Sequence, residues 1–107
     1  MNDILQMQQK IVPEIIDLME KRYTILRAIY YKEPIGRRTL ASQIGLGERI
    51  VRTEVNFLKN QGLIDIDSIG MTVTPEGENI IDALKGCIHE LKGLALVEDI
   101  LEDKLGL

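Results

Sequence analysis

The sequence predicts a mainly α-helical fold that carries one small β-hairpin. Apolar residues recur at helical spacing from about residue 13 to 31 and again over residues 40–58. Directly after Gly62 the period shortens to two, which is typical of paired strands. A Thr-Pro pair at 74–75 then begins another helical pattern.

Two helices are predicted before residue 34. The first has only a weak apolar pattern: Ile4, Met7 and Ile11. Proline fits the first turn of a helix but not its interior, so Pro13 marks a new helix or a kink. The second pattern runs to about Tyr31 through Ile16, Met19, Tyr23, Leu26 and either Ile29 or Tyr30. Pro34 ends it, because the residue before a proline is pushed out of the α region.

The segment 40–64, LASQIGLGERIVRTEVNFLKNQGLI, predicts two helices joined by a tight turn. Gly45 stands where the first helix, residues 37–44, must end with a positive φ. Gly36 and Gly47 are the predicted N-caps, and Gly62 closes the second helix, residues 48–61. The apolar face of the second helix is predicted to consist of Ile50, Val51, Val55 and Leu58, with Phe57 beside it.

The next segment predicts a hairpin and a further helix. Residues 63–67 and 71–74 alternate apolar and polar side chains, and Ser68-Ile69-Gly70 supplies the turn. Thr74 is the predicted N-cap of a helix with Pro75 at its first position. The apolar pattern of this helix continues through Ile80, Leu84, Ile88, Leu91 and Ala95, and a second one follows Gly93: Leu94, Val97, Leu101 and Leu105. A helix-turn-helix followed by a hairpin is a winged helix-turn-helix, here with extra N- and C-terminal helices. Its predicted core is Leu26, Ile29, Leu40, Ile44, Val51, Val55, Leu58, Ile64 and Val73.

The charge of the chain is unevenly distributed. Overall 17 acidic residues outnumber 13 basic ones, which argues against nucleic-acid binding. Residues 21–59, however, hold nine basic side chains against three acidic ones, whereas residues 1–20 hold one against four and residues 60–107 three against ten. Positive charge is therefore concentrated on the segment that carries the helix-turn-helix, and the acidic flanks would repel phosphate.

The exposed side chains of this segment are of the kinds that contact DNA. Arginine, asparagine and threonine can hydrogen-bond to base edges, and basic side chains near a helix start can bind phosphates. Glu48 could either favour the helix N-terminus electrostatically or accept a bond from a cytosine amine. The wing has no Lys or Arg, so only its tip is expected to reach a phosphate, through backbone N–H groups and one hydroxyl. The candidate DNA-binding residues are Arg37, Arg38, Thr39, Glu48, Arg49, Arg52, Thr53, Asn56, Lys59, Ser68 and Gly70.

Each of these residues also has a simpler interpretation. Arg37 and Arg38 could be solvated charges at a helix start, and the row on the second helix could be an ordinary polar face. The richness of that row in arginine and asparagine, rather than glutamate and lysine, favours DNA.

Other candidate sites are weak. The Gly45-Leu46-Gly47 sequence lacks the preceding strand and the spacing of a nucleotide-binding loop. His89 is predicted to be a surface residue, and Cys87 a small core or interface residue rather than a redox switch. No nucleophile and base are paired, so the sequence predicts no enzyme, cofactor or metal site. The sequence has no signal peptide pattern and no apolar run approaching the ~18 residues of a membrane span, so a cytoplasmic protein is expected.

The segment from KRYTILRAIYYKEPIGRRTL through QGLI, together with GMTVTPEG, resembles the N-terminal DNA-binding region of sugar-responsive SorC/DeoR-type bacterial repressors. The likeness is greatest to the branch that controls glycolytic genes, and EPIGRR is among its more specific parts. The resemblance implies a repressor of sugar or glycolytic genes that binds double-stranded operator DNA. In that family a larger effector domain, which binds phosphorylated sugars, follows the winged helix.

These observations together predict two parts. Residues 1–93 form a winged-helix DNA-binding domain with an N-terminal helical extension, and residues 94–107 form a C-terminal helix that links to an effector domain absent from this chain. The terminal helices are expected to pack together and to favour dimers, because two-fold operators are read by two-fold proteins. The alternative function is a winged-helix protein–protein interaction module that does not bind DNA.

Overall fold

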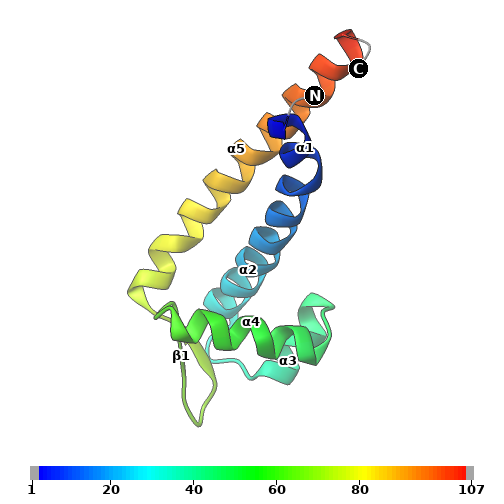
Figure 1. The fold of residues 1–107 in the computed structure, drawn as a ribbon. Coiled ribbons are helices and arrows are strands. Elements are labelled where there is room, and N and C mark those ends of the chain that lie inside the picture. Colours follow the sequence, from blue (N-terminus) through cyan, green and yellow to red (C-terminus); the bar gives the residue numbers. More distant parts are fainter. Residues whose placement is uncertain (1–2, 106–107) are drawn as a thin grey trace.

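The structure is a computed structural model that describes the backbone of residues 3–105. It describes the side chains of residues 3, 4, 6 and 9–93. Within this range five helices and two strands follow one another (Figure 1). They are α1 (Asp3–Lys10), α2 (Val12–Lys32), α3 (Arg37–Ile44), α4 (Glu48–Asn60), β1 (Ile64–Ile66), β2 (Met71–Val73) and α5 (Pro75–Leu105). The prediction of a mainly α-helical winged helix-turn-helix with a small hairpin is confirmed.

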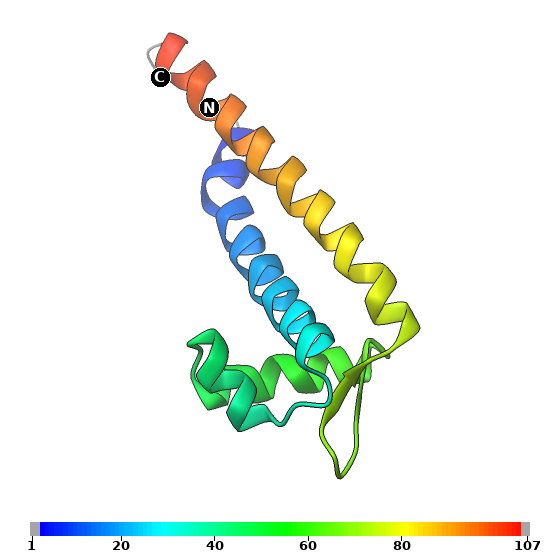
Figure 2. The ribbon, with the colours of Figure 1, turned by 180° about the vertical axis from the view of Figure 1, so that it is seen from behind.

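The elements form two parts, which we call the stalk and the head. The stalk consists of α1, α2 and α5, and α2 and α5 lie side by side in both views (Figures 1 and 2). The head consists of α3, α4 and the hairpin, gathered at one end of the stalk (Figure 1). The molecule is elongated, with extents of 57 × 26 × 21 Å. The surfaces of the head therefore lie far from the C-terminal end of α5.

Prolines set both ends of α2. The helix begins at Val12 with Pro13 in its first turn, which confirms the predicted new helix. It ends at Lys32, and the next residue, Glu33, is extended with ψ 138°, as expected before Pro34.

The core lies where α2, α3, α4 and the hairpin meet. It is built from aliphatic residues, with Met71 the exception: Ile25, Leu26, Ile29, Ile35, Leu40, Ala41, Val51, Val55, Leu58, Ile64 and Met71. Seven of the nine predicted core residues are in this cluster, whereas Ile44 and Val73 are only partly buried against it. Ile50, predicted on the apolar face of α4, is 43% exposed, and that prediction was wrong.

Ile35 and Met71 enter the core through a contact that the sequence analysis missed. The two residues form an antiparallel bridge: the nitrogen of Ile35 lies 3.2 Å from the carbonyl oxygen of Met71, and the nitrogen of Met71 lies 2.8 Å from the carbonyl oxygen of Ile35. Met71 is also in the antiparallel hairpin, where Ile66 faces Met71 and Ile64 faces Val73. The segment between α2 and α3 is thus attached to the wing at a single bridged residue, Ile35.

The start of α5 is fixed against the base of the hairpin. Thr74 caps α5 through its hydroxyl, which accepts the N–H of Gly77 at 3.0 Å and donates to the carbonyl of Gly62 at 2.7 Å. A Cβ on Gly77 would collide with the carbonyl oxygen of Leu63. Only glycine therefore allows the helix to approach the strand this closely.

Helix α5 continues without a break past Gly93, where the sequence analysis placed its domain boundary. A single glycine costs about 1 kcal/mol in a helix, which strong helix formers on both sides can offset. The predicted apolar residues Met7, Leu94, Ala95, Val97, Leu101 and Leu105 lie outside the described side chains. Over the described residues, no helix is long and apolar enough to cross a membrane.

Candidate nucleic-acid interface

The turn between α3 and α4 has the predicted geometry. Gly45 follows α3 with φ 70° and ψ 23°, a left-handed conformation that costs glycine nothing. Gly47 is extended and stands at the N-cap of α4. Leu40 and Ala41 of α3 are buried, and Leu46 packs against the same core. The turn is therefore held in place by apolar contacts on both sides, and it directs α4 across the end of the stalk.

Helix α4 has a buried side and an outward side. Val51, Val55 and Leu58 point into the core, and Glu54 is buried beside them. The opposite side is a row at spacings of four, three and four residues: Arg49, Thr53, Asn56 and Asn60, all of them exposed. Arg52 and Lys59 flank this row and are exposed as well. We call these six residues the reading face.

Asn60 was missed by the sequence analysis. It lies next to the predicted helix end at Gln61, where polar residues are common for reasons of capping alone. Its spacing of four from Asn56 and seven from Thr53 is the signal that could have identified it.

The residues predicted to contact the DNA backbone lie at the start of α3. Arg37, Arg38 and Thr39 occupy its first turn and are all exposed. Arg38 pairs with Glu48, the first residue of α4, with its Nε 3.4 Å from a carboxylate oxygen. Both side chains are largely exposed, so the pair is weak and screened by salt. Glu48 thus has a partner that the sequence analysis did not foresee, and Arg38 can exchange it for a phosphate at little cost.

Thr53 has part of its hydrogen-bonding capacity used within the helix. Its hydroxyl donates to the carbonyl of Arg49 at 3.1 Å. The oxygen can still accept a bond, and the methyl group stays available for contact with a thymine methyl. Thr53 therefore fits a DNA contact as an acceptor or an apolar neighbour rather than as a donor.

The wing tip is closed by its own aspartate. Asp67 accepts the N–H groups of Ile69 and Gly70 on one carboxylate oxygen, at 2.8 and 3.2 Å. The predicted phosphate contact of the tip needed free N–H groups, and these two are already bonded. Aspartate at the start of a turn commonly makes this bond, so the sequence contained the signal. Of the predicted tip residues, Ser68 remains exposed.

Gly70 has a structural reason to be glycine. Its φ is 148°, and a Cβ there would lie 2.9 Å from the backbone nitrogen of Ile35. The close approach of the bridge to the wing accounts for this residue without a DNA contact.

An ion pair lies on the side of α4 that faces the stalk. Nε of Arg22, on α2, is 2.8 Å from a carboxylate oxygen of Glu54. The same guanidinium covers the ring of Phe57, with 3.7 Å between its central carbon and the ring centroid. Neither contact was predicted, because Arg22 and Glu54 are 32 residues apart in the sequence and come together only when the chain folds.

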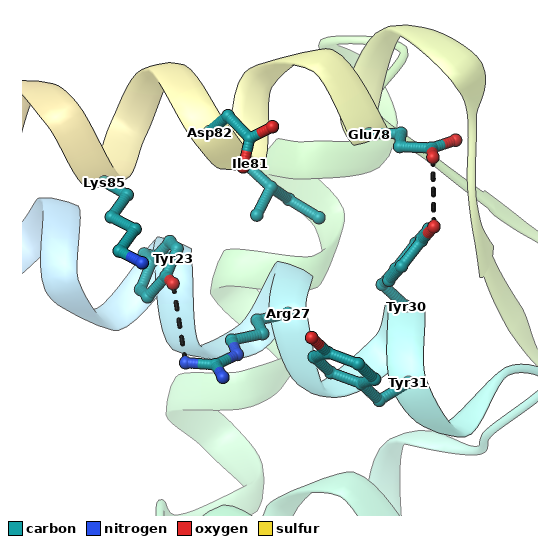
Figure 3. Close-up of a pocket in the computed structure, with 8 residues that line it drawn as sticks. All are labelled: Tyr23, Arg27, Tyr30, Tyr31, Glu78, Ile81, Asp82 and Lys85. Carbon is teal, nitrogen blue, oxygen red and sulfur yellow. Dashed lines mark hydrogen bonds between the residues drawn. The ribbon is translucent and has the colours of Figure 1, made fainter.

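A shallow pocket of about 240 Å³ lies between α2 and α5 (Figure 3). The hydroxyl of Tyr30 donates to a carboxylate oxygen of Glu78 at 2.9 Å, and this bond, with the negative charge of the carboxylate, raises the pKa of Tyr30 above 10.0. Arg27 lies over the rings of Tyr23 and Tyr31. Of these contacts, the bond between Tyr30 and Glu78 joins α2 to α5, whereas Arg27 contacts tyrosines of its own helix.

The remaining candidates are on the surface. His89 is exposed, as predicted. Cys87 is exposed too, so of its two predicted positions the core is wrong, and an interface stays a prediction. Among the residues described here, no three His, Cys, Asp or Glu side chains form a group suited to a metal ion.

Comparison with known proteins gives one family. Residues 18–88 match the family described as the CggR N-terminal DNA binding domain. The chain is 43% identical over its whole length to the central glycolytic genes regulator of Bacillus subtilis (strain 168), and it covers 32% of that protein. It is 46% identical to the central glycolytic genes regulator of Priestia megaterium (strain DSM 319 / IMG 1521), and it covers 31% of that one. The chain thus spans about a third of the length of these curated relatives.

Proposed function

The chain belongs to the CggR N-terminal DNA-binding domain family, and we propose that it binds duplex DNA sequence-specifically as the reading head of a bacterial repressor of glycolytic genes. In this proposal α4 enters the major groove. Arg49, Arg52, Thr53 and Asn56 contact base edges, while Arg37, Arg38 and Thr39 contact the backbone. Acting on chromosomal DNA implies a cytoplasmic location.

The reading face is the observation that carries the proposal. Its six residues are polar, and three of them are basic: Arg49, Arg52 and Lys59. The one acidic residue near the middle of α4, Glu54, is turned inward and paired with Arg22. Apart from Glu48 at the start of the helix, which is paired with Arg38, the exposed residues of α4 therefore present donors and positive charge, which suits the acceptor-rich edge of guanine and the phosphates beside it.

Asn60 extends this assignment by one helical turn. It continues the row of Arg49, Thr53 and Asn56, so it would lie near the same groove. On the wing, Ser68 is the residue that we retain as a phosphate contact.

One observation favours the alternative, a protein-association module. Ile50 and Phe57 are 43% and 37% exposed and lie seven residues apart on one flank of α4. Phe57, however, is covered on one ring face by Arg22. Against these two residues on one flank, the reading face has six exposed polar residues, so DNA is the better-supported partner.

The salt dependence of binding tests the proposal. If roughly four to six basic side chains of one protomer contact phosphates, about that many counterions are released, and the logarithm of the affinity should fall with a slope near −0.9 per contact on a logarithmic salt scale. Fluorescence anisotropy of a labelled random-sequence duplex at several salt concentrations would measure this slope. A flat dependence would refute a phosphate-dominated interface and favour protein association.

Two finer parts of the proposal concern a further domain in a longer protein and the self-association of the chain. The relatives are about three times as long as this chain, and the resemblance to sugar-responsive repressors supports a further domain that binds a phosphorylated sugar. We also propose self-association through the terminal helices, because Ile11 and Ile15 are 49% and 42% exposed at the end of the stalk away from the head.

A further inference from the structure

We propose that Arg22 is a positioning residue for DNA recognition: from α2 it fixes the orientation of α4 by holding Glu54 and Phe57, and it does not itself contact DNA. The inference rests on the proposed function, because it concerns how accurately the reading face is presented to the groove.

The contacts of Arg22 have the geometry of a clamp. Its guanidinium donates from Nε to Glu54 at 2.8 Å, and its central carbon lies over the Phe57 ring, 3.7 Å from the ring centroid. Glu54 and Phe57 are three residues apart, so they are neighbours on one side of α4. One planar group therefore holds two points of the helix at once, by its edge and by its face.

This clamp restricts a motion that the core alone restricts less. Val51, Val55 and Leu58 hold α4 through apolar contacts, whose energy follows the buried area and therefore changes gradually with a small rotation. A charged hydrogen bond weakens when its distance or angle changes, and stacking on a ring is lost when the ring moves aside. Rotation of α4 about its own axis would break both contacts of Arg22.

The same rotation would misplace the residues that read DNA. Arg49, Thr53 and Asn56 lie on the side of α4 opposite to the core, so a turn of the helix moves them sideways relative to the base edges. Hydrogen bonds to bases require close alignment, whereas attraction to phosphates depends on charge at longer range. Loss of the clamp should therefore reduce sequence discrimination more than general DNA affinity.

The burial of the pair distinguishes it from ordinary surface ion pairs. The Glu54 side chain is 10% exposed and that of Arg22 is 25% exposed. Among the described side chains, Glu54 is the only charged side chain that is buried. A partly desolvated pair with a bond of this length is screened less by salt than the exposed pair of Arg38 and Glu48.

The decisive variant is Arg22→Met/Glu54→Gln, which removes the clamp but leaves the net charge unchanged. The probe is the duplex that the wild-type 107-residue chain enriches from a random 30-base-pair pool, compared with a scrambled duplex of the same composition. We expect the ratio of the two affinities to fall about five- to tenfold, the effect of losing one well-aligned base contact, while the scrambled duplex binds as before with the same salt slope.

Two further variants separate positioning from other effects. Arg27→Met removes an arginine from the same helix whose guanidinium lies over Tyr23 and Tyr31, and it should leave the ratio within about twofold of the wild type. Arg22→Lys keeps the charge but lacks the planar group, so its ratio should lie between those of the wild type and the double variant. Circular dichroism and urea unfolding establish that each variant is folded at the assay temperature.

The outcomes are distinct. An unchanged ratio in the folded double variant overturns the inference, because the pair would then only neutralise a buried carboxylate. If the double variant does not fold, Phe57→Leu removes the stacking partner alone, and an unchanged ratio in that variant is equally decisive. A wild-type chain that enriches no duplex from the pool would refute the proposed function itself.

Discussion

The exposed side chains of α3 and α4 divide into those placed to contact DNA bases and those placed to contact the DNA backbone. The first group lies on the reading face of α4 and includes Arg52 and Asn56, whereas Arg37 and Arg38 stand at the start of α3. The first group projects from the helix that we place in the groove. The second group lies at a helix N-terminus, where phosphates are commonly bound.

This division predicts two classes of variant. Arg52→Ala and Asn56→Ala should each weaken binding to the enriched duplex by about 1–3 kcal/mol more than binding to scrambled DNA. Arg37→Ala and Arg38→Ala should weaken both about equally, because phosphates are present in every sequence. Competition titrations with both duplexes measure the difference, and Lys85→Ala, a lysine on the stalk, is the matched control for lost charge. Equal losses for all four variants on both duplexes would show that the reading face is misassigned.

At the scale of elements, the joint between β1, α4 and α5 determines where the head is held. Thr74 bonds to Gly62, which follows α4, and Gly77 lets α5 pass against the carbonyl of Leu63. Tyr30 adds a bond from α2 to Glu78 in the first turn of α5. Helix α4, the wing and helix α5 thus meet within a few residues of one another.

Gly77→Ala should therefore destabilise the protein. The added methyl group meets backbone rather than a flexible side chain, so we expect a loss of about 1–3 kcal/mol or more in the free energy of unfolding. Gly86→Ala is the control, since a Cβ there meets nothing within 4 Å and the position is helical; it should gain up to about 1 kcal/mol. Urea unfolding followed by circular dichroism measures both. Similar stabilities for the two variants would contradict the close approach of α5 to β1.

At the scale of the whole molecule, the segment that carries the helix-turn-helix and the C-terminal residues differ in charge. The segment 21–59, which carries the helix-turn-helix, has nine basic residues against three acidic ones, while residues 94–107 have four acidic residues and one lysine. Exposed isoleucines mark the start of α2 and the residue before it. We therefore expect the chain to bind DNA at one end and a second copy of itself at the other.

Sedimentation velocity tests the second copy. At tens of micromolar we expect a dimer that weakens when residues 94–107 are removed, and also in Ile15→Lys, which places a charge on the exposed apolar surface. Ile69→Lys is the matched control, because Ile69 is 75% exposed on the wing tip and should not affect association. A monomer under all these conditions would refute self-association through the terminal helices.

The sequence by itself determined the parts of this protein that depend on neighbouring residues. Pro13 and Pro34 set the ends of α2, Gly45 set the turn, and Thr74-Pro75 set the start of α5, since each acts through its own backbone or the adjacent turn. The outward polar row of α4 followed in the same way from helical spacing. The position of Asp67 before the wing turn was an equally local signal.

Tertiary structure alone decided which of these surfaces came together. The bridge between Ile35 and Met71 joins residues 36 apart, and the bond between Arg22 and Glu54 joins residues 32 apart. Ile50 is exposed and Glu54 is buried because of the way α4 is oriented against α2, and no local pattern encodes that orientation. It follows from packing the whole core at once, because a small rotation of one helix exchanges the residues that face its neighbour.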